Sequence, residues 1–265
     1  MNQALIISIG NELLSGKTVN TNATFLAKKL TNLGLIVKKV LTIPDEREIV
    51  VIELTKALVE KNFRIIIVTG GLGPTWDDST AKFLAEALNV PLKVQAEAIN
   101  IVTERYHELY RNGIVDTDEI TSAREKMAYL PVGAKAIYNP VGTAPGIFFD
   151  YKPSDCWIFC LPGVPKEMQE MFSIIEPQLH NIQKKEHLEY YEENLMVPFT
   201  DESLLAPFLD QVRENYDVWI KSLPKTYQER KNISLIISSS SDKNEEAKKN
   251  VLKAKEFLKS LIKLN

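Results

Sequence analysis

The alternation of short apolar runs with amphipathic helical patterns is the sequence feature that most limits how this chain can fold. Apolar runs and helical patterns follow each other in the order 4–9, 22–34, 35–43, 45–61, 63–70 and 77–89. Residues 65–68 are apolar on both faces, as expected of a parallel strand that is covered by helices on each side. The pattern therefore predicts an α/β fold with a mostly parallel sheet covered by helices.

The pattern changes in the last third of the chain. Helical patterns, short strands and a further helix first follow one another at 96–112, 118–129, 134–139, 146–150, 155–162 and 165–179. All 11 glycines lie at or before Gly163, and from about residue 184 the order becomes strand, helix, strand, strand and helix. We predict an α/β domain with a ligand cleft at residues 1–175 and a smaller α+β domain at residues 184–265.

The order of elements in residues 184–265 is similar to that of RNA-binding KH modules. A KH module holds the nucleic-acid backbone with a G-x-x-G loop, and residues 164–265 contain no glycine. The formal net charge of the chain is -3 at pH 7, so no global basic field recruits nucleic acid or an acidic membrane surface. We therefore expect no nucleic-acid partner and no membrane partner.

The sequence also carries no targeting or membrane-spanning signal. No apolar run approaches the ~18 residues that a membrane helix needs. The N-terminal segment "MNQALIISIG" lacks the basic region of a signal peptide. We expect a cytoplasmic protein.

The two cysteines and three histidines do not suggest a catalytic site. Cys156 and Cys160 lie four residues apart on one predicted strand, which places them about 13 Å apart on the same face. That distance is too long for a disulfide, so we expect buried core thiols. His107, His180 and His187 lie away from every glycine motif, and we expect them not to be catalytic.

The stretch "GNELLSGKT", residues 10–18, nearly matches a phosphate-binding P-loop. A P-loop has four residues between its glycines, whereas five separate Gly10 from Gly16. Consecutive N–H groups must wrap one phosphate in a P-loop, and the extra residue together with the acidic Glu12 spoils that arrangement. We predict that the loop is not a P-loop.

Four unusual loops follow predicted strands, and their sequences are "GNELLSGKTVNTN", "GGLGPTWDDST", "NPVGTAPG" and "LPGVPKEM". In open parallel sheets, ligands bind outside the carboxyl ends of the strands, so at least the first two loops should open onto one cleft. The glycines of the second loop allow positive φ and close approach of a ligand, and the helix after it offers an anion site. An alternative is a tight turn in which Thr75 and Asp78 form a variant capping box.

These motifs, together with "REKMAYLPVGAKAIYNPVGTAPG" and "LPGVPKEMQEMF", resemble the CinA family over roughly residues 3 to 175. The resemblance implies an N-terminal molybdopterin-binding-type domain, shared with molybdenum-cofactor biosynthesis proteins. It extends more weakly through residues 193–212, which look like the small domain that follows in that family. Longer members also carry a nicotinamide-nucleotide amidohydrolase domain, and we expect that activity to be absent here.

The resemblance, together with the acidic and glycine-rich character of these loops, suggests a set of site residues. Glu12, Asp77 and Asp78 are the candidate catalytic residues, with Asp77 and Asp78 as candidate metal ligands. The candidate ligand-binding residues are Gly10, Asn11, Gly70, Gly71, Gly73, Thr75, Gly142, Thr143, Pro162 and Gly163. Lys17 is a further candidate for contact with a phosphate, although an exposed lysine explains it as well. Asn20 and Asn22 match the family motif but could also cap a helix, and Trp76 could stack on a base or fill a domain interface.

The function implied by the resemblance is hydrolysis of a nucleotide-like diphosphate, of the ADP-ribose pyrophosphatase type. Where the molybdenum-cofactor proteins usually read G-G-T-G with an arginine before the motif aspartate, this chain has Leu72 and Asp77. Carboxylates beside a phosphate are explained if a divalent cation such as Mg²⁺, Mn²⁺ or Co²⁺ bridges them, or if they hold hydroxyl groups of the ligand, and we expect the metal. The alternatives are a molybdopterin-binding or molybdenum-cofactor biosynthesis protein, whose ligand is a pterin phosphate, and a non-catalytic scaffold. We expect a homo-oligomer in each case.

Overall fold

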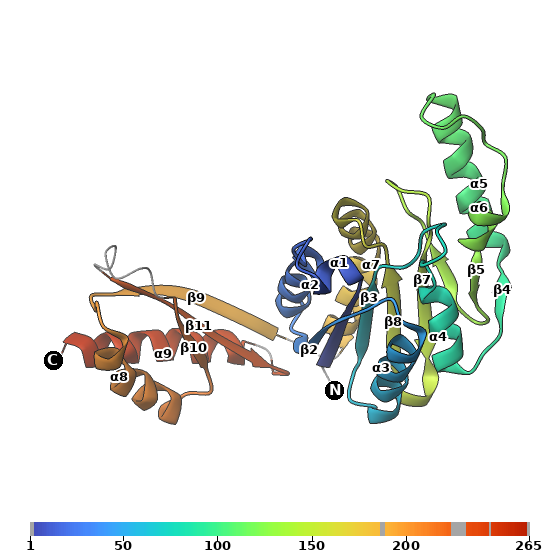
Figure 1. The fold of residues 1–265 in the computed structure, drawn as a ribbon. Coiled ribbons are helices and arrows are strands. Elements are labelled where there is room, and N and C mark those ends of the chain that lie inside the picture. The colour runs from blue at the N-terminus through green and yellow to red at the C-terminus, as the bar shows by residue number, and fades with distance from the viewer. Residues whose placement is uncertain (1–2, 186–188, 224–231, 244, 264–265) are drawn as a thin grey trace. The chain divides into compact units, whose positions relative to one another are not determined.

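The computed structural model describes residues 3–185, 189–223, 232–243 and 245–263, so His187 lies outside the described residues. The chain divides into two compact units (Figure 1), one formed by residues 1–30 and 36–178 and the other by residues 31–35 and 179–265. Within the described residues, no helix is both long enough and apolar enough to span a membrane.

The first unit contains a six-stranded sheet in the order β2-β1-β3-β8-β7-β6. Its strands are β1 (Gln3–Ile9), β2 (Ile36–Ile43), β3 (Ile65–Thr69), β6 (Lys135–Ile137), β7 (Gly146–Tyr151) and β8 (Cys156–Leu161). Strands β2, β1, β3 and β8 are parallel, and β7 is antiparallel to both of its neighbours. The prediction of a mostly parallel sheet is confirmed. All five residues of β3 are buried, as the apolar run 65–68 predicted.

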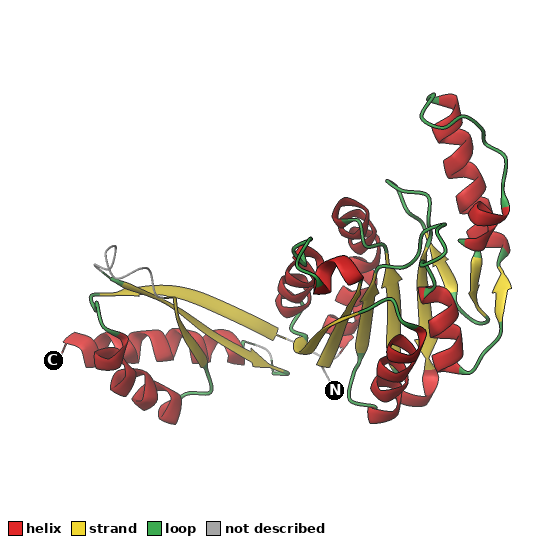
Figure 2. Ribbon diagram, viewed as in Figure 1, coloured by secondary structure: helices red, strands yellow, loops and turns green. Residues whose placement is uncertain are grey.

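Helices cover both faces of this sheet (Figure 2). The helices α3 (Arg47–Glu60), α4 (Thr80–Leu88) and α5 (Ala96–Arg111) contribute to one core cluster, which also contains alternate residues of β1. The helices α2 (Thr21–Asn32) and α7 (Pro165–Lys185) pack against each other through an edge-on contact between Phe25 and Phe172. Their contact also includes an ion pair of 3.1 Å between Lys29 and Glu176.

The segment predicted as a helix at residues 118–129 is mostly not helical. Only α6 (Ser122–Lys126) forms there, and β5 (Tyr129–Pro131) then pairs with β4 (Leu92–Val94) in a separate antiparallel ribbon. The Arg124 side chain donates to the carbonyls of Thr117 and Glu119, and Thr121 caps the short helix. These local hydrogen bonds compete with helix formation before residue 122, which explains why the prediction was wrong.

The second unit is an antiparallel sheet with helices. Its elements are β9 (Glu189–Val197), α8 (Glu202–Asn215), β10 (Trp219–Leu223), β11 (Ile233–Ser241) and α9 (Glu246–Lys263). The strands lie in the order β10-β11-β9, and apolar residues of β9, β11, α8 and α9 share one core. The order of strands and helices agrees with the prediction, and the buried residues of α9 recur every three or four positions.

The two cysteines are buried, free thiols of β8. Burial raises the pKa of both the Cys156 and the Cys160 thiol to about 12. Thiols with such a high pKa hold almost no thiolate at neutral pH. The prediction of buried core thiols is confirmed.

Candidate functional site

The carboxyl ends of the parallel strands converge on a cleft in the first unit. Gly10 follows β1, Asp45 lies two residues beyond β2, Gly70 follows β3 and Pro162 follows β8. The loop before β7 lies at the same edge, because β7 runs antiparallel to β8. Residues from all five segments line a cleft of about 580 Å³. This is the position expected for a ligand site in an open parallel sheet.

Most of the predicted site residues line this cleft. They are Gly10, Glu12, Gly70, Gly71, Gly73, Asp77, Asp78, Gly142, Thr143, Pro162 and Gly163. Asn11 and Thr75 do not line it, but each contacts a residue that does: Asn11 donates its backbone N–H to Asp45, and Thr75 binds Asp77 and Asp78. The analysis of the sequence missed Thr18, Asp45 and Glu167, which also line the cleft.

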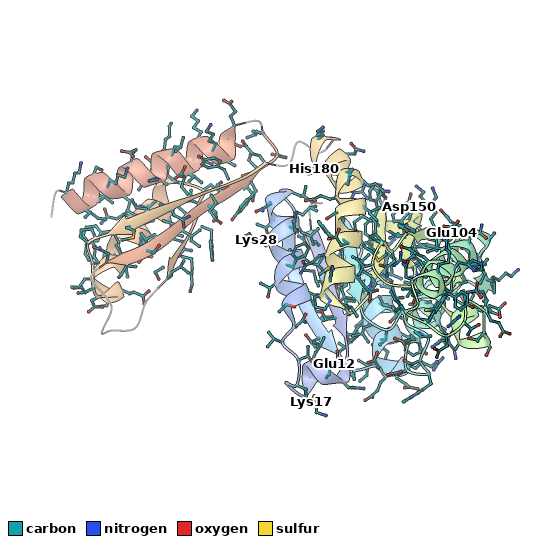
Figure 3. All side chains as sticks on the ribbon, turned by 90° about the horizontal axis from the view of Figure 1, so that it is seen from above. Glu12, Lys17, Lys28, Glu104, Asp150 and His180 are labelled. Carbon is teal, nitrogen blue, oxygen red and sulfur yellow. The ribbon has the colours of Figure 1, made fainter. Side chains whose placement is uncertain are left out.

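The first loop forms one helical turn, α1 (Asn11–Leu14), and no phosphate nest. The N–H groups of Leu13 and Leu14 donate to the carbonyl of Gly10, and that of Ser15 donates to Asn11. Amides that are bonded within the turn cannot wrap a phosphate, so the prediction that this is not a P-loop is confirmed. Figure 3 shows Glu12 close to Lys17 at one edge of the unit, whereas Lys28 lies farther along α2.

A chain of hydrogen bonds ties the ends of three strands together. The Thr69 hydroxyl of β3 donates to Ser8 of β1 at 3.3 Å, Ser8 donates to Asn20 at 3.4 Å, and Asn20 donates to Thr42 of β2 at 3.2 Å. The Asn20 side chain also accepts from the Ala23 N–H at 3.1 Å. Asn20 is therefore a structural cap of α2 that also joins β1 to β2 at the ends of these strands.

Asn22 acts on a different loop. Its side chain is 7% exposed and donates to the Gly163 carbonyl at 2.7 Å. Its side-chain oxygen is buried and has no hydrogen-bond partner among the described residues. The amide thus positions the loop after β8 and does not cap a helix.

Gly70 and Gly71 lack a side chain for a different reason than Gly163 does. Gly70 and Gly71 have φ values of 103° and 67°, and a Cβ would clash with the Ile9 carbonyl at Gly70 and with the Thr80 hydroxyl at Gly71. The fold itself therefore requires both glycines. The φ of Gly163 does not lie in the left-handed region that favours glycine. A Cβ at this position would lie 3.4 Å from its nearest heavy atom, the Gly70 Cα, which is an ordinary van der Waals contact. The lack of a side chain at Gly163 instead leaves room in the cleft.

Asp77 and Asp78 are both held by Thr75. The Thr75 hydroxyl lies 2.6 Å from Asp77 Oδ1 and 2.5 Å from Asp78 Oδ2, and its single hydrogen serves one carboxylate at a time. The Thr75 N–H donates to Asp78 at 3.0 Å, and Lys126 donates to the Thr75 carbonyl. The interpretation as a capping box is wrong, because α4 begins only at Thr80 and its N-cap Ser79 makes no side-chain cap bond.

The loop that carries Gly142 and Thr143 is held from two sides. Asn139 is fully buried; it accepts from the N–H groups of Val141 and Gly142 and donates to Glu167 at 2.7 Å. Arg105, which is 7% exposed, reaches from α5 and donates to the Val141 and Gly142 carbonyls, each at 2.8 Å. No pattern in the sequence points to Arg105, because only the fold brings α5 beside this loop.

The cleft is strongly acidic. The carboxylates that line it are Glu12, Asp45, Asp77, Asp78 and Glu167, and no lysine or arginine is among its described lining residues. Burial, followed by repulsion from Glu12, Asp77 and Asp78, raises the pKa of Asp45 to about 6. By contrast, the hydrogen bond from the Thr75 hydroxyl lowers the pKa of Asp77.

The donor set does not fit the predicted divalent metal. Among the described residues, no group of three or more His, Cys, Asp or Glu side chains is arranged to hold a metal ion. The two predicted ligands, Asp77 and Asp78, bind the Thr75 hydroxyl instead. A step through a metal therefore has no basis in this arrangement.

Comparisons with known proteins place this site within a described family. A family model, MoCF_biosynth, described as "Probable molybdopterin binding domain", matches residues 5–181. A relative from Saccharolobus islandicus is 40% identical over 99% of this chain and 95% of its own length. A relative from Pyrococcus furiosus is 39% identical over 97% of this chain and 96% of its own length.

A solved structure extends the comparison. The crystal structure of the protein CinA, of unknown function, from Thermoplasma acidophilum is 33% identical with a TM-score of 0.59. The match covers 67% of this chain and 98% of that one. The resemblance to the CinA family is confirmed.

The family match corrects the predicted activity. The matching family is described as molybdopterin-binding, and nothing in the match supports an ADP-ribose pyrophosphatase, so that prediction is wrong. The alternative, a molybdopterin-binding or molybdenum-cofactor biosynthesis protein, agrees better with the match.

Proposed function

The chain belongs to the MoCF_biosynth family of probable molybdopterin-binding domains, and on this premise we propose that its cleft binds a pterin of the molybdopterin type. The main support for this proposal is the location of the cleft within the region that matches the family. Every residue that lines the cleft, from Ile9 to Glu167, lies within the matched residues 5–181. The region that defines the family thus contains the whole candidate site.

The chemistry of the cleft supports a pterin. Ionised carboxylates only accept hydrogen bonds, so an acidic cleft favours a ligand edge that is rich in N–H donors. A pterin presents such an edge, because its 2-amino group lies beside a ring N–H. We propose that Glu12, Asp45 and Asp78 receive these donors, and that Gly70, Gly71 and Gly163 let the flat ring approach the backbone.

The pKa of Asp45 supports an active role in cofactor biosynthesis. A carboxyl with a pKa of about 6 can accept and release a proton near neutral pH, as a general base or acid must. Within the cleft, Asp45 would hold or move the proton of a ring nitrogen, while the side-chain oxygens of Glu12, Asp77 and Asp78 would accept hydrogen bonds from the ligand. This role requires no residue beyond those that line the cleft.

A substitution at Gly163 tests the proposal. A methyl group at this position makes only ordinary contact within the protein, but it occupies ligand space. Gly163→Ala should therefore fold normally and lower the affinity for 6-hydroxymethylpterin, measured by pterin fluorescence, at least tenfold.

Gly113→Ala is the matched control. Its φ is 67°, and nothing lies within 4 Å of a Cβ there, so it should cost about 1–2 kcal/mol of stability and leave affinity unchanged. Absence of pterin binding by the wild-type protein, or equal binding by Gly163→Ala, would contradict the proposal.

A further inference from the structure

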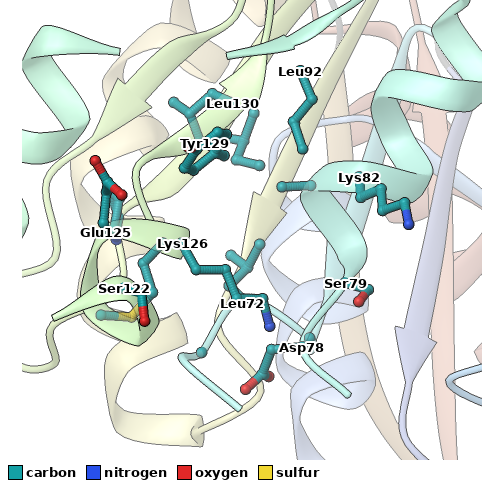
Figure 4. Close-up of a pocket in the computed structure, with 16 residues that line it drawn as sticks. Leu72, Asp78, Ser79, Lys82, Leu92, Ser122, Glu125, Lys126, Tyr129 and Leu130 are labelled. Atoms are coloured by element: carbon teal, nitrogen blue, oxygen red, sulfur yellow. The ribbon is translucent and has the colours of Figure 1, made fainter. Parts of the chain in front are cut away.

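A second hollow also borders the loop between β3 and α4. It has a volume of about 370 Å³ and shares Gly71, Leu72, Gly73 and Asp78 with the acidic cleft. Its remaining walls come from α4, α6, the β4–β5 ribbon and the start of β7. We call it the lysine pocket, after Lys82 and Lys126 (Figure 4).

The two hollows differ in charge. Lys82 and Lys126 line the lysine pocket together with two carboxylates, Asp78 and Glu125. The cleft, in contrast, is lined by carboxylates without a basic side chain among the described residues. Charges of opposite sign attract and charges of like sign repel most strongly at short distance near a protein surface. An anion is therefore repelled by the cleft and is accepted much better by the pocket.

The start of α4 adds to this preference. Ser79, Ala81 and Lys82 line the lysine pocket, and the first intrahelical bond of α4 is donated by Phe83 to the Ser79 carbonyl. The N–H groups of Ala81 and Lys82 precede that bond, so they have no acceptor within the helix. The positive end of the helix dipole thus acts in the same direction as the two lysines.

The walls of the lysine pocket are mainly apolar. Leu72, Met127, Leu130 and Ile147 are buried side chains that line it, and Figure 4 shows Leu92 and Tyr129 beside Leu130. The side chain of Lys126 extends from α6 toward Asp78 (Figure 4) and donates to the Thr75 carbonyl. Lys82 is exposed and Lys126 is partly exposed, so both remain accessible to an anionic group of a ligand.

We infer that the ligand is divided between the two hollows: its donor-rich ring lies in the acidic cleft, and its anionic phosphate lies in the lysine pocket. The inference rests on the proposed function and adds the direction in which the ligand binds. The ligand would pass from one hollow to the other beside Gly71, Leu72, Gly73 and Asp78, which line both. The apolar walls would contact the carbon and sulfur atoms that connect a molybdopterin ring to its phosphate.

The test compares two probes that differ only in the phosphate: 6-hydroxymethylpterin and its phosphate monoester. The wild-type protein should bind the phosphate ester at least tenfold more tightly than the alcohol. In Lys82→Met/Lys126→Met this ratio should fall to about one, and the loss of the Lys126 bond to Thr75 should change the affinity for both probes by the same factor. Lys82→Met alone should lower the ratio in part, and it leaves the Lys126 bond to Thr75 in place.

Two further lysines serve as controls. Lys28 is exposed on α2 and lines neither hollow, so Lys28→Met should keep the wild-type ratio. Lys17 is exposed on the loop that carries Glu12 and lines neither hollow; a ratio lowered by Lys17→Met and not by the pocket variants would place the phosphate beside that loop and overturn the inference. If neither probe binds the wild-type protein, the proposed function itself has failed. If the alcohol and the ester bind with equal affinity, the inference is wrong but the proposed function stands.

Discussion

At the scale of single residues, Asp45 is the group whose environment changes its chemistry most. Its pKa rises from 3.8 to about 6 because of burial and three neighbouring carboxylates. A group with a raised folded-state pKa binds more protons in the folded than in the unfolded protein between these two values. Its contribution to stability is therefore complete below pH 4 and is lost as the pH rises through 6.

This linkage predicts the behaviour of Asp45→Asn. The amide keeps an acceptor for the Asn11 N–H but cannot ionise, so the stability of the variant relative to wild type should rise between pH 4 and 6 and then stay level. Urea unfolding at several pH values measures this difference. Asp116→Asn, at an exposed position outside the cleft lining, should show no such rise. A flat difference for Asp45→Asn would contradict the raised pKa.

Residues of the site differ in how readily the sequence reveals them. Gly70, Gly71, Gly73 and Asp78 stand in one dense motif after an apolar run, so their position at the end of a strand could be predicted. Asp45 also follows a strand closely, but it was assigned to the predicted helix 45–61, whereas α3 begins at Arg47. An acidic residue directly after a parallel strand was the signal that could have identified it.

At the scale of elements, the site depends on how α5 holds the loop before β7. Arg105 is the link, because its guanidinium binds two carbonyls of that loop and also pairs with Glu108. This contact joins residues far apart in the sequence, which is why periodicity could predict α5 but not its role. The same limit applies to α6 and the β4–β5 ribbon, which are too short for a periodic pattern.

Arg105→Met tests this link. The variant keeps the apolar part of the side chain but leaves the carbonyls of Val141 and Gly142 without their donors, at a cost of about 1.5–3 kcal/mol for hydrogen bonds to a charged group. The affinity for 6-hydroxymethylpterin should also fall, because Gly142 and Thr143 line the cleft. Unfolding by urea and the fluorescence titration measure the two effects.

Arg111→Met, at an exposed position on the same helix, is the control and should change neither quantity appreciably. Normal stability of Arg105→Met would show that the loop does not depend on this residue.

At the scale of the whole molecule, the two units have different relations to function. The candidate site lies in the first unit, which also holds most of the matched family region. The relatives match nearly the whole chain, so the second unit recurs in them although the candidate site does not include it. Residues 164–265 contain no glycine, so we still expect that this unit does not bind RNA in the manner of a KH module.

The crystal structure of the protein with the phosphate ester of 6-hydroxymethylpterin tests the central claim most directly. Our account predicts electron density for the ring between Glu12, Asp45 and Gly163, with the N–H edge toward the carboxylates. It predicts density for the phosphate beside Lys82 and Lys126. A ring bound outside the cleft, or a cleft that stays free of density while the ester binds elsewhere, would contradict it.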